Sequence, residues 1–119
     1  MAALYTSNAK PDSLKADAYI LYTILGSYFK ECKIDNTILE KRLFLNYKDL
    51  SINKQQTREE KIIDKVEKIG DEYLDTLKDT VAACNITFED DEAIVLFYAD
   101  KKVIVKARVN RKGAIRFFV

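Results

Sequence analysis

The chain has 119 residues, 48% of them hydrophobic and 33% charged, and a formal net charge of +1. This length predicts one domain, spanning residues 1–119, and the composition excludes wholesale disorder. The sequence has no histidine, which removes the commonest general base and the imidazole metal ligands. The two cysteines, Cys32 and Cys84, are too few and too far apart for a zinc site.

The first predicted helix runs from Leu14 to about Phe29, after a loose arm over residues 1–10. Asp12 or Ser13 is the expected cap. The apolar run over residues 18–29 is shorter than the roughly 20 residues that a membrane span needs. A helix that is apolar almost all round is central in a core or part of an interface. Three aromatic side chains at the edges of its aliphatic stripe are candidates for binding a partner: Tyr19, Tyr22 and Tyr28.

Two further helices are predicted from pairs of residues with capping-box spacing. Thr37 with Glu40 predicts a helix from residue 38 to about residue 46 or 47, and residues 48–56 are expected to connect it to the next element. Thr57 with Glu60 predicts a long helix over residues 57–83, in which apolar side chains recur every three or four positions. These are Ile62, Val66, Ile69, Tyr73, Leu77 and Val81.

From residue 85 onward the apolar period changes to two, which is typical of strands. Four strands are expected, separated by an acidic turn at residues 89–92, a turn at residues 100–101 and a tight hairpin at Asn110-Arg111-Lys112-Gly113. The sequence therefore predicts an α+β fold, with three N-terminal helices over residues 12–83 packed on a four-stranded antiparallel β-meander over residues 85–119.

Two arrangements of the helices on this sheet are open. In the first, the long helix packs on the apolar sheet face. In the alternative, the first helix docks there and the long helix is peripheral. The residues expected on the covered face are Val103, Val105, Ile115 and Phe117.

Charge is divided unevenly along the chain. The last nineteen residues carry seven cations and no acid, whereas residues 1–100 hold thirteen cations and nineteen acids. The predicted basic surface consists of Lys102, Lys106, Arg108, Arg111, Lys112, Arg116 and Phe118. Such a surface is typical of a solvated sheet face, of a site for an acidic protein or of a site for nucleic acid.

The sequence gives no sign of catalysis. It lacks a glycine-rich phosphate loop and a G-x-S-x-G motif, and its consecutive acids at residues 89–92 are not spaced like the ligands of a calcium loop. We therefore expect no enzyme activity, no cofactor, no metal site, no small-molecule ligand and no membrane association.

The function expected from these features is that of a small soluble protein-interaction or assembly module that self-associates and offers a basic sheet surface to an acidic partner. Nucleic-acid binding through the same sheet surface is the alternative. No signal peptide is recognised at the N-terminus, so we expect a cytoplasmic protein with reduced cysteines.

Overall fold

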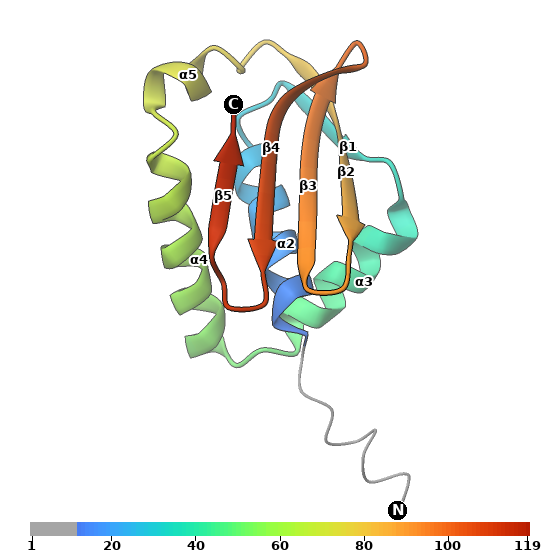
Figure 1. Cartoon of the computed structure of the whole chain (residues 1–119), viewed down its shortest axis with the longest axis vertical. Coiled ribbons are helices and arrows are strands. Elements are labelled where there is room, and N and C mark those ends of the chain that lie inside the picture. Colours follow the sequence, from blue (N-terminus) through green and yellow to red (C-terminus); the bar gives the residue numbers. More distant parts are fainter. Residues whose placement is uncertain (1–11) are drawn as a thin grey trace, which may run out of the picture.

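The computed structural model describes residues 12–119 and has the predicted α+β fold, with the helices in the N-terminal part and most of the sheet in the C-terminal part (Figure 1). The predicted arm over residues 1–10 lies outside the described residues. The elements are α2 (Ser13–Gly26), β1 (Glu31–Ile34), α3 (Thr37–Lys48), α4 (Ile52–Glu67), α5 (Asp71–Asp75), β2 (Val81–Phe88), β3 (Glu92–Ala99), β4 (Lys102–Asn110) and β5 (Ile115–Phe118).

The sheet has five strands in the order β1-β2-β3-β4-β5 and is mixed. Strands β2 to β5 form the predicted antiparallel meander, but β1 adds a strand parallel to β2, with Glu31 opposite Val81 and Ile34 opposite Cys84. The prediction of a purely antiparallel four-stranded sheet, with no strand among residues 12–83, is therefore wrong. Strand β1 has only four residues, too few to show a period of two, and its partner lies far away along the chain.

Helix α2 is the central element of the core. It packs on β2, β3 and β4 through one face and on α3 and α4 through others. Leu14, Leu21 and Leu25 are each at most 1% exposed, as are Val95 and Phe97 of β3. The first predicted arrangement, with the long helix on the sheet, is wrong, and the alternative holds, because α4 packs on α2 and lies beside the β5 edge (Figure 1).

The long helix predicted over residues 57–83 is divided in the structure. Helix α4 begins at Ile52 because the side chain of Ser51 caps it, accepting a hydrogen bond from the Lys54 amide at 3.3 Å. Thr57 lies inside the helix, where its hydroxyl donates to the Asn53 carbonyl. The predicted capping box at Thr57 is therefore absent.

Gly70 interrupts the helix, although the apolar repeat continues beyond it. Its φ of 109° is incompatible with an α-helix and is readily adopted only by glycine. Helix α5 follows as a short segment, and the chain is already in strand β2 at Val81. Tyr73, Leu74 and Leu77 still pack on the core, so the apolar repeat indicated burial correctly while the conformation changed.

The starts of α2 and α3 agree with the sequence to within one or two residues. Asp12 caps α2, accepting hydrogen bonds from the amides of Leu14 and Lys15, as one of the two expected caps. Asn36, rather than Thr37, caps α3, with both hydrogen bonds at 3.1 Å. In both helices the residue before the first turn supplies the oxygen that the unpaired first amides require.

The central position of α2 predicts unequal effects for two matched leucine substitutions. Leu21→Ala leaves a cavity beneath the sheet and should lower the free energy of unfolding by about 2–5 kcal/mol. Leu45→Ala, on α3, should change it by less than about 1 kcal/mol, since Leu45 is 59% exposed. Urea unfolding followed by circular dichroism measures both. Equal losses would contradict the placement of α2.

Candidate functional site

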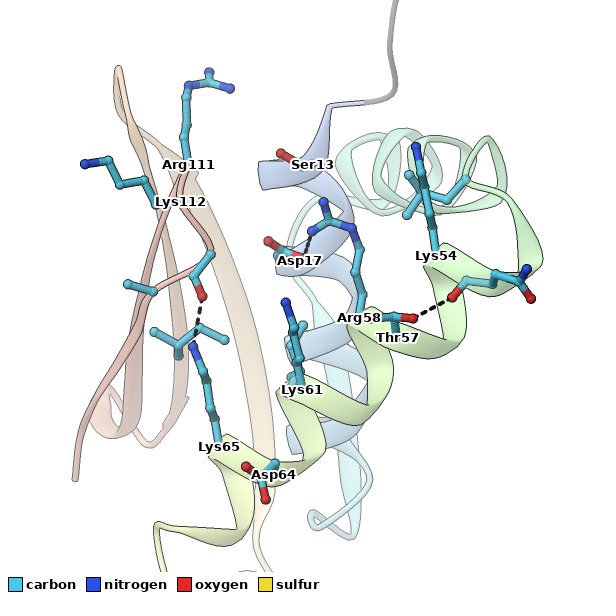
Figure 2. Close-up of a pocket in the computed structure, with 16 residues that line it drawn as sticks. Ser13, Asp17, Lys54, Thr57, Arg58, Lys61, Asp64, Lys65, Arg111 and Lys112 are labelled. Atoms are coloured by element: carbon cyan, nitrogen blue, oxygen red, sulfur yellow. Dashed lines mark hydrogen bonds and ion pairs between the residues drawn. The ribbon is translucent and has the colours of Figure 1, made fainter.

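One side of the sheet is not covered by any described helix. In Figure 1 helix α2 lies behind the strands, and in Figure 2 the helices lie together on one side of the sheet. We call the other side the open sheet face. Its residues alternate with the buried side chains of β3 and β4 and lie in register across the strands. On β3, β4 and β5 they are Glu92, Ile94, Leu96, Tyr98, Val103, Lys106, Arg108, Arg116 and Phe118.

Cross-strand pairing arranges most of this face in two rows. In one row Leu96 lies opposite Lys106, which lies opposite Phe118. In the other, Ile94 lies opposite Arg108, which lies opposite Arg116. Aliphatic side chains therefore stand on β3 and cations on β4 and β5, which makes the face amphipathic across the strands.

The cations of the open sheet face are only partly engaged. The Lys106 ammonium lies 5.6 Å from the centroid of the Phe118 ring, within the range of a cation–π contact. Arg108 pairs with Glu92 at 3.6 Å. The Nε of Arg108 is shielded from solvent and has no hydrogen-bond partner among the described residues. The Arg108 side chain is 38% exposed, so the rest of its guanidinium is accessible to a partner.

The structure separates the seven residues predicted for the basic sheet face. Lys106, Arg108, Arg116 and Phe118 share the open sheet face as expected. Lys102 does not, because Phe97 pairs with Val105 and Tyr98 pairs with Val103, leaving one extra residue on β4. Such a bulge reverses the alternation. Val103, which is 50% exposed, therefore takes the side on which Lys102 was predicted.

The three predicted partner-binding tyrosines are packed within the chain. The Tyr19 ring centroid lies 5.6 Å from that of Phe44 and 5.3 Å from that of Tyr47. Tyr22 stacks on Phe97 and donates a hydrogen bond to Glu40, and burial together with this carboxylate raises the pKa of Tyr22. Tyr28 is half-buried against the core. These side chains join α2 to α3 and the sheet.

A groove separates α4 from the β4–β5 hairpin and the start of α2. Its volume is about 1010 Å³. Arg111 and Lys112, predicted on the sheet face, line this groove instead, because the hairpin tip extends beyond the strands. The groove was not predicted from the sequence. One signal for it was present, because cations recur along α4 at intervals of four, three and four residues. The cations with this spacing are Lys54, Arg58, Lys61 and Lys65.

Two of the α4 cations have internal partners (Figure 2). Arg58 pairs at 2.5 Å with Asp17, which is only 5% exposed. Burial raises the pKa of the Asp17 carboxyl, and Arg58 opposes that rise. Lys65 donates to the Gly113 carbonyl at 3.0 Å and so ties α4 to the hairpin. Lys54 and Lys61 are exposed and form no ion pair with the described residues.

The two thiols are poorly suited to nucleophilic chemistry. Both cysteines are free, and burial, aided by Glu40, raises the pKa of Cys32 to about 11. Burial raises the pKa of Cys84 further. Among residues 12–119 no three His, Cys, Asp or Glu side chains lie together in a way that could hold a metal ion.

Comparison with known proteins does not place the chain. It matches no protein-family model, no curated protein and no solved structure. Within residues 12–119 no helix combines the length and the hydropathy needed to cross a bilayer. Its function must therefore be inferred from the two surfaces described above.

The thiol environment predicts slow modification of the native protein. At pH 8 a pKa of about 11 leaves about a thousandth of Cys32 as thiolate, against about a quarter for an ordinary cysteine. Ellman's reagent should therefore react at least about a hundredfold more slowly with native protein than with protein unfolded in urea. Rapid reaction of one thiol in the native protein, assigned with Cys32→Ser, would show that this environment is wrong.

Proposed function

We propose that the chain is a non-catalytic protein-interaction module that uses the open sheet face to bind an acidic protein surface. The observation that carries the proposal is the juxtaposition of aliphatic side chains on β3 with cations on β4 and β5, on a sheet side that no described helix covers. Apolar contact would supply most of the affinity, and the cations would orient the partner and speed its approach.

The chemistry of the face defines the partner. Arg116 is exposed and the Arg108 side chain is 38% exposed, so carboxylates are the complementary groups. Leu96 and Ile94 are half-buried and provide an apolar strip beside these cations. A partner segment with acids along one edge and aliphatic side chains along the other would match both.

Nucleic-acid binding through this face is the alternative. Single-stranded nucleic acid is held largely by base stacking on aromatic rings. The open sheet face offers the ring of Phe118, over which Lys106 already lies, and the ring of Tyr98, whose hydroxyl donates to Asp35. The aliphatic side chains of β3 occupy the positions where further rings would be needed, so an acidic protein fits this face better.

A second copy of the chain offers one such acidic surface. Helix α5 and the turn after it expose four acids and lie at the opposite end of the molecule from the β4–β5 hairpin (Figure 1). Symmetric pairing of two open sheet faces would oppose like charges, so self-association would be head to tail. The acids are Asp71, Glu72, Asp75 and Asp79.

Self-association of this kind should depend on salt. In sedimentation velocity at high protein concentration, we expect a larger species at about 50 mM salt that dissociates near 500 mM, because screening shortens the range of the attraction. Lys106→Glu with Arg116→Glu should leave a monomer at both salt concentrations. Lys30→Glu with Lys41→Glu makes the same change in net charge at exposed sites elsewhere and should retain the larger species. A monomeric wild type at low salt would refute self-association.

Binding of a heterologous partner can be tested with a synthetic peptide. A fluorescent amphipathic helix of about 18 residues, with glutamate on its polar face and leucine on the other, should bind at micromolar concentration. Lys106→Glu with Arg116→Glu should weaken binding at least about tenfold, since each reversal replaces attraction by repulsion.

The control peptide carries lysine in place of each glutamate and should bind at least about tenfold more weakly. Equal affinity for the two peptides would show that the cations do not select the partner. Unchanged binding by the double variant would show that the peptide binds elsewhere, which contradicts the proposal.

A further inference from the structure

Helix α4 carries a straight row of cations along the groove. Lys54, Arg58, Lys61 and Lys65 follow one another at intervals of four, three and four residues, which places them on one face of the helix. With a rise of about 1.5 Å per residue, the row is about 16 Å long. A row of this length suits a polymer with repeated negative charges better than a single small anion.

The opposite wall of the groove is also basic. The hairpin contributes Arg111, whose Nη1 lies 3.5 Å from Asp12 at the start of α2 and whose Nε lies 3.5 Å from Asp91. These contacts hold the hairpin tip beside the N-terminus of α2. Lys112 follows on the tip and points away from α4 (Figure 2). Six cations and two acids line the groove, and the two acids that pair with Arg111 lie beside it, so its net charge is positive.

The orientation of the helices adds to this positive charge. Helices α2 and α4 both begin at the hairpin end of the molecule (Figure 1), and a helix N-terminus carries partial positive charge. The side chains of Lys54, Arg58 and Lys61 extend from α4 toward this same end (Figure 2). Asp12 caps α2 and offsets the charge at its N-terminus, so the positive charge at this end of the groove comes from the three side chains and the first amides of α4.

Internal contacts leave part of this charge without a partner. Asp17 neutralises Arg58 and holds it in place, and the bond from Lys65 to Gly113 fixes the separation of the two walls. Lys54 and Lys61 are exposed and have no ion pair within the described part of the chain. A polyanion in the groove would pair with both ammonium groups.

We infer that this groove binds the phosphate backbone of a nucleic acid without regard to base sequence. Among the described residues that line it there is no aromatic side chain, so bases have no ring on which to stack. The contacts available are ammonium and guanidinium groups, which position a backbone but do not read sequence. The groove and the open sheet face lie on different sides of the sheet, so this function is additional to protein binding.

Fluorescence anisotropy with labelled oligonucleotides of about 20 nucleotides tests the inference. Single-stranded oligo(dT), single-stranded oligo(dA) and a mixed-sequence duplex should all bind in the micromolar range at about 50 mM salt. The two single strands should agree within about threefold, because bases are not read. Between roughly 50 and 200 mM salt, affinity should fall at least about tenfold, as expected when several phosphates displace counterions.

Three double variants with equal changes in net charge locate the site. Lys54→Glu with Lys61→Glu should weaken binding at least about tenfold. Lys30→Glu with Lys41→Glu, at exposed positions outside the groove, should reduce affinity less than about threefold. Lys106→Glu with Arg116→Glu, on the open sheet face, should also have only this smaller effect. Thermal unfolding of each variant verifies that it is folded.

Two results would overturn the inference. One is the absence of binding by the wild type at tens of micromolar protein and about 50 mM salt. The other is a loss of binding that follows Lys106 and Arg116 rather than Lys54 and Lys61, which would place the nucleic acid on the sheet. An affinity for oligo(dT) far above that for oligo(dA) would contradict backbone recognition and indicate base contacts.

Discussion

The structure depends on the burial of α2 against one side of the sheet. Leu14, Leu21 and Leu25 fill the space beneath β3 and β4, and removal of this apolar surface from water is the main force that holds the layers together. Because alternate strand residues point to opposite sides, burying Val105 and Ala107 obliges Lys106 and Arg108 to face outward. The open sheet face is therefore a direct consequence of the core. The groove is a further consequence of this packing, because α4 packs on α2 and is separated from the hairpin tip.

Much of this fold could be predicted from local patterns. The alternation from residue 102 onward, the Asn110–Gly113 turn and the Asp12 cap each depend on residues close together in the chain. The remaining features depend on distant contacts. Strand β1 is recognisable only when β2 is beside it, and the bulge opposite Phe97 and Tyr98 appears only when two strands are aligned. The positive φ of Gly70 interrupts a helix that the apolar repeat would continue.

The candidate surfaces also combine features that local patterns predicted with features that depend on distant contacts. The period of two placed Lys106, Arg108, Arg116 and Phe118 together correctly, because all four lie in neighbouring strands with regular register. It failed at Lys102, beyond the bulge, and it could not assign the hairpin tip to a wall of the groove. The row of cations on α4 could be recognised in the sequence from its spacing. Recognising all four cations as one row required the correct start of the helix, because the predicted start at Thr57 left Lys54 outside the helix.

The central claim is that one small domain carries two separate basic surfaces, with an apolar strip on one and none on the other. Amide chemical-shift mapping by NMR tests it most directly, with an acidic amphipathic peptide and an oligonucleotide titrated in turn into the same labelled protein. We expect the peptide to shift the signals of β3, β4 and β5 on the open sheet face and the oligonucleotide to shift those of residues 54–65 and 111–113. If both ligands shifted one common set of residues, or if neither shifted any, the account would be contradicted.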